Sequence, residues 1–310
     1  MSNLARPPAP SRATTVHPRE QPVSPDDLLA DLRAVLRSEP ALPGLSPSDY
    51  ARSHAAFELL SDQRQLISSY LRDRLSDRLG PVSVLSVGCG DGTLDAPLAA
   101  GLSDVRPSRP VRYVGVDPYA GSTSAFEAAL RDLGQDSLSV EVHTVPFEAL
   151  PVVKAFDVIT FVHSTYYVRD LDETLTAAFA LLRPGGELLV LAAPRAELNA
   201  LVEVLAPPVG GHDQWFSDDV ERALEQTGLP RDATATLDAG FDAAAASDDV
   251  LDFAVQARLT PELRPLVRAY LDAIAAPSHE RSSAPVAGLE PGTARQVPHP
   301  VDVFRIVCAG

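Results

Sequence analysis

Short apolar runs alternate with amphipathic segments along most of the chain. Five runs rich in valine, isoleucine and leucine are typical of buried strands, and they fall within residues 81–92, 111–118, 138–145, 156–162 and 186–194. Segments with helical spacing separate them, at residues 93–102, 124–134 and 171–186. Continuous apolar strands that alternate with helices predict a parallel sheet covered on both faces. The pattern therefore predicts an α/β, Rossmann-like fold.

Helical patterns also precede and follow this alternation. Ser24 and Ser46 are each followed by a proline and acidic residues, which is the signature of a helix start. A third helix with leucines at helical spacing is predicted to end at Gly80. Later segments predict a helix at 217–229, a strand within 233–241, two helices at 247–277 divided near Pro261, a loop at 278–300 and a last strand at 301–310.

These patterns divide the chain into three parts. Residues 1–24 are rich in Pro, Arg, Ser and Thr and are predicted to form a disordered arm, because they cannot bury enough apolar surface. Residues 25–80 are predicted to form an N-terminal helical region. Residues 81–310 are predicted to form a seven-stranded, mostly parallel sheet with helices on both faces. A helical insertion at about 247–277 precedes the last strand.

The charge balance narrows the range of partners. The formal net charge is −16, from 26 basic and 42 acidic side chains. This balance argues against nucleic acid, whose binding rewards clustered Lys and Arg. It suits a cationic partner, although acidic residues also serve solubility alone.

Cysteine usage and hydropathy narrow the class of protein further. Cys89 and Cys308 are too few for a disulfide framework or a Cys-rich zinc site, so no metal is expected. The first residues lack the apolar core of a signal peptide, and no run reaches the roughly 18 apolar residues of a membrane span. We expect a cytoplasmic monomer with no membrane partner.

Glycines and one carboxylate follow the first two predicted strands. Gly88, Gly90 and Gly92 follow the first, where glycine lets the backbone approach a ligand and turn into a helix. Their spacing does not match the dinucleotide pattern G-x-G-x-x-G. Asp117 follows the second strand, where its carboxylate is placed to accept both ribose hydroxyls of a nucleoside. The alternative for Asp117 is a cap for the following helix.

The stretch FVHSTYYVRDL, residues 161–171, follows the fourth predicted strand. Ligands bind at the carboxyl ends of the strands in sheets of this kind, so we expect its polar groups to face a pocket. Among them, His163 is suited to accept a proton near neutral pH, and Tyr166 and Tyr167 to attract a cation. The alternatives are a histidine bonded to backbone at the strand end, and one buried and one surface tyrosine.

The motifs VLSVGCGDGTLDAPL, VGVDP, FDVIT, YYVRDL and LLRPGGELLVL resemble class I S-adenosylmethionine-dependent methyltransferases over about residues 50–310. More narrowly, YARSHAAF, YYVRDLDETL, FSDDVERALEQTGL, VLDF and the closing FRIV are similar to histamine N-methyltransferases. The resemblance implies S-adenosyl-L-methionine as cofactor. Its implied binding residues are Gly88, Cys89, Gly90, Asp117, Pro118, Phe147, Glu148 and Val162. By chemistry alone, Phe147 suits stacking on a purine and Glu148 suits its amino group, although packing and surface charge explain them equally well.

The same resemblance implies that residues 25–80 form an N-terminal helical lid over the substrate region, and it implies where the methyl acceptor binds. His163, Tyr166 and Tyr167 are the implied catalytic residues. The implied substrate-binding residues are Tyr50, His54, Phe57, Gln63 and His299. Gln63 stands where the family has an amine-binding glutamate, and a neutral amide cannot pair with an ammonium as a carboxylate does. This difference makes histamine itself a poor candidate and a related amine a better one.

Together these features predict an S-adenosylmethionine-dependent N-methyltransferase. Its expected acceptor is a small cationic amine or the α-amine of a peptide, in natural product biosynthesis or peptide modification. One alternative is an O-methyltransferase that acts on a carboxylate or a phenol, which the replacement of glutamate by Gln63 favours. Another is a non-catalytic regulatory protein that binds the cofactor, although such a protein does not need the polar groups at 163–167.

Overall fold

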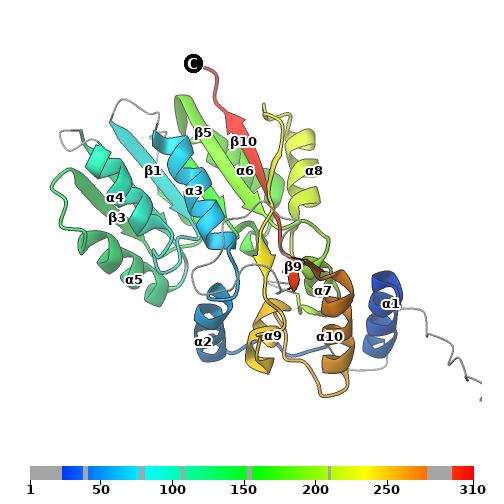
Figure 1. The fold of residues 1–310 in the computed structure, drawn as a ribbon. Helices are drawn as coiled ribbons and strands as arrows, with labels where there is room; N and C mark the ends of the chain where they lie inside the picture. Colours follow the sequence, from blue (N-terminus) through cyan, green and yellow to red (C-terminus); the bar gives the residue numbers. More distant parts are fainter. Residues whose placement is uncertain are drawn as a thin grey trace, which may run out of the picture.

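The computed structural model describes residues 23–37, 41–76, 81–105, 109–151, 156–208, 211–277 and 295–310. A seven-stranded sheet with helices on both faces forms one part of the molecule, and a group of helices beside one edge of the sheet forms the other (Figure 1). In this described part of the chain, no helix is long and apolar enough to cross a membrane.

The strands of the large sheet are β1 (Val82–Val87), β2 (Val111–Val116), β3 (Leu138–His143), β4 (Phe156–Val162), β5 (Leu182–Ala192), β6 (Ala235–Leu237) and β10 (Val301–Val307). Their spatial order is β3-β2-β1-β4-β5-β10-β6. The first five strands run parallel, and β10 runs antiparallel to both β5 and β6. This arrangement confirms the predicted seven-stranded, mostly parallel sheet.

Helices cover the two faces of the sheet because neighbouring strand residues point in opposite directions. Val84 packs in a core with α3 (Gln63–Ser76), α4 (Asp95–Val105) and α5 (Ala120–Arg131). The next residue, Leu85, packs in a core with α6 (Leu171–Ala180) and α8 (Ser217–Thr227). Burial on both faces explains why the strands are apolar throughout.

A third core holds the helices beside the sheet. It joins α1 (Pro25–Leu36), α2 (Pro47–Glu58), α7 (Leu198–Leu205), α9 (Asp248–Ala254) and α10 (Leu263–Ile274). A small antiparallel sheet of β7 (Gly240–Phe241), β9 (Arg295–Pro298) and β8 (Ala276–Pro277) adjoins them. The N-terminal helices and the helical insertion, which are far apart in sequence, therefore form one packed unit.

Serine caps start the first two helices as their sequences predict. The hydroxyl of Ser24 accepts a hydrogen bond from the Asp27 N–H at 3.2 Å, and that of Ser46 accepts one from the Asp49 N–H at 3.2 Å. Each cap pairs a backbone donor that the helix leaves open and is worth about 1 kcal/mol.

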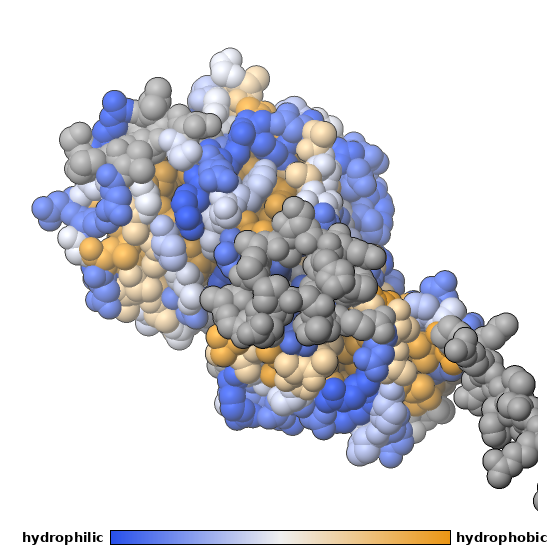
Figure 2. Space-filling view, in the orientation of Figure 1, coloured by the Kyte–Doolittle hydropathy of each residue, from blue (hydrophilic) through white to orange (hydrophobic). Residues whose placement is uncertain are grey.

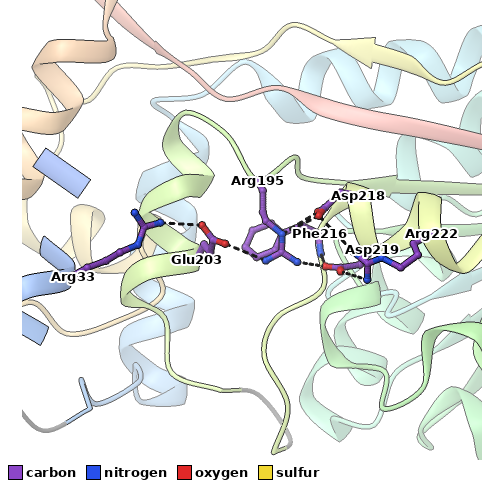
Figure 3. A network of polar contacts seen from close by, with 7 residues as sticks. All are labelled: Arg33, Arg195, Glu203, Phe216, Asp218, Asp219 and Arg222. Atoms are coloured by element: carbon purple, nitrogen blue, oxygen red, sulfur yellow. Dashed lines mark hydrogen bonds and ion pairs between the residues drawn. The ribbon is translucent and has the colours of Figure 1, made fainter. Parts of the chain in front are cut away.

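A chain of ion pairs connects the helical unit to the sheet domain (Figure 3). Arg33 of α1 lies 3.5 Å from Glu203 of α7, and Glu203 lies 3.4 Å from Arg195, which follows β5. Arg195 also pairs with Asp218 and Asp219 at the start of α8. Its guanidinium lies over the ring of Phe216, 4.6 Å from the centroid. Since most of these charges are partly exposed, we expect the chain of pairs to orient the two parts more than to stabilise them.

Three details of the predicted elements are wrong. The predicted helix at 171–186 ends at Ala180, and residues from Leu182 onward belong to β5. Residues 295–298 of the predicted loop form β9, because their backbone pairs with β7 and β8. Helix α7 was not predicted, although its residues are almost all buried. Residues 1–22 and Gly80 lie outside the described residues, so the disordered arm and the helix end stay predictions.

Hydrophobic and hydrophilic residues are interspersed over the visible surface of both parts (Figure 2). The exposed large apolar or aromatic side chains among the described residues are Val23, Leu59, Tyr119 and Tyr167. Tyr119 and Tyr167 both follow the carboxyl ends of parallel strands, β2 and β4. Two of the four exposed side chains therefore lie at the carboxyl ends of the parallel strands.

Candidate active site

The turn after β1 needs glycine for steric reasons. Gly88 has a φ of 67°, and a Cβ there would lie 2.4 Å from the Cβ of Ser164. Its N–H donates to the Val116 carbonyl at 2.8 Å, which fixes the turn against β2. Gly90 also has a positive φ, of 56°, but a Cβ there would meet nothing within 4 Å. A side chain at Gly88 would thus clash with the segment after β4, whereas a side chain at Gly90 would meet open space.

Asp117 bridges the ends of β1 and β2. One carboxylate oxygen accepts a hydrogen bond from the Gly90 N–H at 3.3 Å, and the other accepts one from the Tyr119 N–H at 2.9 Å. The first cap position of α5 belongs to Tyr119, which makes no side-chain cap, so Asp117 does not cap that helix directly. A carboxylate offers about four acceptor sites, so two stay available to ribose hydroxyls. This donor and acceptor arrangement fits the expected cofactor.

The remaining cofactor candidates lie around the same turn but differ in burial. Phe147 is nearly buried and packs edge-on against Phe161 at 5.6 Å, which supports a packing role at least as well as stacking on a purine. Pro118 and Glu148 are exposed, and Val162 is half-buried at the end of β4. Burial, with nearby acidic groups, raises the pKa of the Cys89 thiol, so the thiol stays neutral.

His163 follows β4 in an unusual backbone conformation. Its φ is 49°, a region that non-glycine residues rarely adopt, and its N–H donates to the Leu191 carbonyl of β5 at 3.0 Å. Its Nδ1 lies 2.7 Å from the hydroxyl of Tyr166, and that hydroxyl accepts a hydrogen bond from the Ala193 N–H at 3.0 Å. Nε2 is buried and has no hydrogen-bond partner among the described residues.

Burial lowers the pKa of His163 to about 4, and the carboxylate of Glu58 offsets this only in part. The imidazole is therefore neutral near pH 7. The assignment that uses the Tyr166 hydroxyl both as acceptor from Ala193 and as donor has it donating to Nδ1, which leaves the proton on Nε2. His163 then presents an N–H donor, not a lone pair, at its unpaired nitrogen.

The two tyrosines of the short 3-10 helix Thr165–Tyr167 have different environments. Tyr166 is buried and holds His163, whereas Tyr167 is 53% exposed. This arrangement matches the alternative of one buried and one surface ring. Desolvation, followed by the neighbouring Tyr50 of α2, nevertheless raises the pKa of Tyr167.

Helix α2 presents aromatic side chains to this edge. Tyr50, His54 and Phe57 lie on one side of α2 and pack on Phe253 of α9, at ring distances of 5.0, 5.4 and 5.1 Å. Phe57 also meets the ring of His299 edge-on at 5.5 Å. The predicted substrate residues of α2 are therefore brought together with the segment before β10.

His299 and Gln63 meet, but through the backbone. The Gln63 amide donates to the His299 carbonyl at 2.9 Å, so this amide is already engaged. Burial, followed by the charge of His163, lowers the pKa of His299 to about 3. Its Nδ1 is buried without a hydrogen-bond partner among the described residues. Both imidazoles are therefore neutral near pH 7, and each has a buried nitrogen without a hydrogen-bond partner among the described residues.

Two charged residues of the lid were not predicted. The Arg64 Nε lies 2.6 Å from Glu58 Oε2, and His54 Nε2 lies 3.4 Å from both side chains. Glu58 follows His54 by one helical turn, a spacing that indicates contact but not a role at a site. In the described part of the chain, no group of three or more His, Cys, Asp or Glu side chains is placed to hold a metal ion.

Comparison with known proteins identifies the family. The family described as a methyltransferase domain matches residues 53–230, more than half of the chain. The chain belongs to this methyltransferase family. Its members use S-adenosylmethionine, and the glycine turn and Asp117 described above fit that cofactor. The narrower resemblance to histamine N-methyltransferases finds no specific support in these comparisons.

Individual relatives match only in part. A ubiquinone biosynthesis O-methyltransferase of Pseudomonas fluorescens is 28% identical over 47% of this chain and 60% of its own length. A tRNA U34 carboxymethyltransferase of Shewanella amazonensis is 34% identical over 40% of this chain and 36% of its own. The chain therefore spans only about a third to three fifths of these relatives.

A crystal structure of a methyltransferase from Bacillus halodurans shares the fold, with a TM-score of 0.52 and 15% identity over 78% of this chain and 99% of that one. At this identity the likeness concerns the fold alone. The large sheet and its flanking helices are thus those of a known methyltransferase fold.

Proposed function

We propose that this methyltransferase transfers a methyl group to the carboxylate of a small molecule and forms a methyl ester. The observation that carries the proposal is the contact of His163 Nδ1 with the Tyr166 hydroxyl, at 2.7 Å, while that hydroxyl accepts from the Ala193 N–H. It gives His163 an unpaired Nε2–H at the end of β4.

Bound S-adenosylmethionine supplies an electrophilic methyl group, and the protein has to hold an acceptor beside it and exclude water. Asp117 and the turn at Gly88 and Gly90 would hold the cofactor. His163, His299 and the aromatic side chains of α2 would hold the acceptor. The influence of Tyr50 and Tyr167 on each other's pKa supports an approach of α2 to this edge of the sheet.

The low pKa values of the two histidines restrict the acceptor. Imidazoles with pKa values of about 4 and about 3 cannot take a proton from an ammonium group, whose pKa is about 10 in a lysine-like amine. The acceptor therefore has to be nucleophilic without losing a proton to either histidine. A carboxylate meets this condition at neutral pH, and a phenol does not.

The Nε2–H of His163 favours oxygen for a second reason. A carboxylate has several lone pairs, so one can accept from His163 while another stays free for the methyl group. A neutral amine has a single lone pair, and a hydrogen bond from His163 would occupy it. Gln63 and Glu58, the lid groups best placed to hold an ammonium, are engaged with the His299 carbonyl and with Arg64.

The amine that the sequence predicts stays as the second candidate. The rings of Tyr50, Phe57 and Tyr167 favour a cation, and each such contact is worth roughly 0.5–2 kcal/mol. The similarity to an O-methyltransferase of ubiquinone biosynthesis supports oxygen as the acceptor atom, although it covers less than half of this chain.

Chemical stability of the product separates the two candidates. The protein is incubated with methyl-tritiated S-adenosylmethionine and panels of carboxylic acids, phenols, amines and peptides. We expect transfer to a carboxylic acid and release of the label as methanol in mild alkali. Label that resists alkali and appears on amines only would contradict the proposal and support N-methylation.

A pair of variants tests how His163 acts. In His163→Gln, an amide nitrogen replaces Nε2 and keeps a donor there, whereas in His163→Asn the donor moves to the position of Nδ1. We expect Gln to keep more than a tenth of the turnover and Asn to lose about 10- to 100-fold. Equal losses of about 10²–10⁴-fold that recover at high pH would instead show a general base. Thermal unfolding of each variant controls for the strained backbone.

A further inference from the structure

Asp95 is a buried carboxyl group without a role in the site as described so far. It is the first residue of α4 and is only 4% exposed. The N–H of the next residue, Ala96, donates to the Gly92 carbonyl at 2.8 Å, so the helix continues directly from the glycine turn. The Asp95 carboxyl group therefore lies inside the protein, next to the turn that fits the cofactor.

The hydrogen-bond partner of Asp95 is a neutral group. The hydroxyl of Tyr113, a 1% exposed residue of β2, donates to Oδ1 at 2.8 Å. Tyr113 packs in the same core as the Cys89 side chain, which comes from the glycine turn. The buried side chains of α3 and α5, the helices that pack on this core, carry no charge. Among the described residues, no basic side chain pairs with Asp95 or lowers its pKa.

The carboxyl group of Asp95 is charged at neutral pH. Burial raises its pKa to about 6, and the hydroxyls of Tyr113 and Ser86 oppose this only in part, so the group is ionised at pH 7 and above. A buried carboxylate without a basic partner costs free energy, of which the N-terminus of α4 offsets a part through its dipole. The remaining cost falls when a positive charge binds at the turn, because opposite charges attract more strongly where water is excluded.

The cofactor and its product differ in charge at one atom. The sulfur of S-adenosylmethionine is a sulfonium cation, and it becomes the neutral thioether of S-adenosylhomocysteine when it keeps the electron pair of the bond to the transferred methyl group. We infer that the Asp95 carboxylate makes the glycine turn prefer the cationic cofactor to the neutral product. Because Asp95 is buried, it acts through its charge and not through a hydrogen bond to either ligand. This preference favours the exchange of product for new cofactor after each transfer.

The two ligands themselves provide the test. Titration calorimetry measures S-adenosylmethionine and S-adenosylhomocysteine on the full chain at pH 7.5, for wild type and for Asp95→Asn, which keeps the shape of the side chain and removes its charge. We expect Asp95→Asn to weaken S-adenosylmethionine about 3- to 10-fold relative to S-adenosylhomocysteine. A structural role alone would change both affinities equally.

The pH dependence of the preference gives a second readout. Asp95 takes up a proton between pH 7.5 and pH 5, so wild type should lose its preference for the cationic ligand over this range, whereas Asp95→Asn should show no such change. The other titratable groups around Asp95 keep their charge state. Raised pKa values keep the Tyr113 hydroxyl and the Cys89 thiol neutral, and a lowered pKa keeps Asp91 charged.

Matched variants complete the experiment. Asp104→Asn removes an exposed carboxylate near the other end of α4 and should leave the ratio of the two affinities unchanged. Tyr113→Phe keeps the carboxylate but removes its donor, which should raise the pKa of Asp95 and shift the pH dependence upward. This shift tests the inference even if Asp95→Asn does not fold.

Two results would overturn the inference. One is an equal change of both affinities in Asp95→Asn, and the other is a preference in wild type that does not depend on pH. Either result would leave the acceptor proposal standing, because these titrations contain no acceptor.

Discussion

The two halves of the sheet's carboxyl edge are built from different kinds of group. At the ends of β1 and β2, the site consists of backbone atoms and one carboxylate: the Gly88 N–H donates to the Val116 carbonyl, and the Gly90 N–H donates to Asp117. At the ends of β4 and β5, imidazoles and hydroxyls come from segments as far apart as Gln63 and His299. The first half is set by local backbone geometry, and the second by packing of the lid onto the sheet.

This difference predicts which half of the site can change with the acceptor and which half stays the same. Backbone contacts at the glycine turn do not depend on the identity of distant side chains, so a cofactor site of this form is compatible with many acceptors. The acceptor half depends on His163, Tyr166 and His299, so its chemistry changes with each of them. The two halves should therefore respond to different substitutions.

The largest effect is expected at the closed side of the turn. Gly88→Ala places a Cβ against Ser164 and imposes a positive φ on alanine, so we expect it to cost about 2–4 kcal/mol of unfolding free energy. Gly90→Ala meets no atom and should cost about 1 kcal/mol, from its φ alone. Urea unfolding measures both. Equal losses would show that the steric difference between the two glycines is not real.

Acid should destabilise the acceptor half in particular. The folded pKa of His163, about 4, lies below the ordinary 6.5, so the unfolded chain binds more protons between these values and stability falls as the pH falls through them. Between pH 7 and pH 4 we expect wild type to lose about 3 kcal/mol more than His163→Asn. Parallel stability curves for the two proteins would contradict a depressed pKa.

Asp117→Ala tests the cofactor half without the acceptor. Removal of the ribose acceptors should weaken S-adenosylhomocysteine by about 1–3 kcal/mol, whereas His163→Gln should leave that affinity nearly unchanged. Titration calorimetry compares the two variants. If Asp117→Ala binds as wild type does, the ribose assignment is wrong, and if His163→Gln binds weakly, the two halves are not independent.

The smallest effect concerns the contact between lid and sheet. A double-mutant cycle of Tyr50→Phe and Tyr167→Phe should show a coupling below about 1 kcal/mol, because one partner is half exposed. The coupling should appear in acceptor KM more than in cofactor affinity. A coupling of zero in both would mean that these two hydroxyls do not hold α2 against the sheet.

The fold and the cofactor half could be predicted from sequence because their determinants are local. Strand periodicity, the glycines and Asp117 each lie within a few residues of the element that they explain. Helix α7 was missed because it has only 8 residues, and one exposed charged residue, Glu203, among buried apolar ones is too little to reveal a helical period. Strand β9 was missed for a different reason, because its pairing partners are not adjacent: those in β8 lie about 20 positions earlier, and those in β7 more than 50.

The sequence predicts the position of the acceptor half but not the contacts and protonation states of its side chains. The run after β4 indicated polar chemistry, yet neither the contact of His163 with Tyr166 nor the depressed pKa follows from residue types. The pairing of Glu58 with Arg64 was equally hidden, because charges at helical spacing are common on exposed faces. A role for His163 as a base is reasonable for an exposed histidine and poor for a buried one.

The protonation state of His163 is the most direct test of the proposed chemistry. Nitrogen-15 NMR of histidine-labelled protein, with the signal assigned by its loss in His163→Asn, reports which ring nitrogen carries the proton. We predict a neutral ring protonated at Nε2, with no titration between pH 5 and pH 8. A proton on Nδ1, or a titration near pH 6.5, would contradict the donor role and restore His163 as the base for an amine.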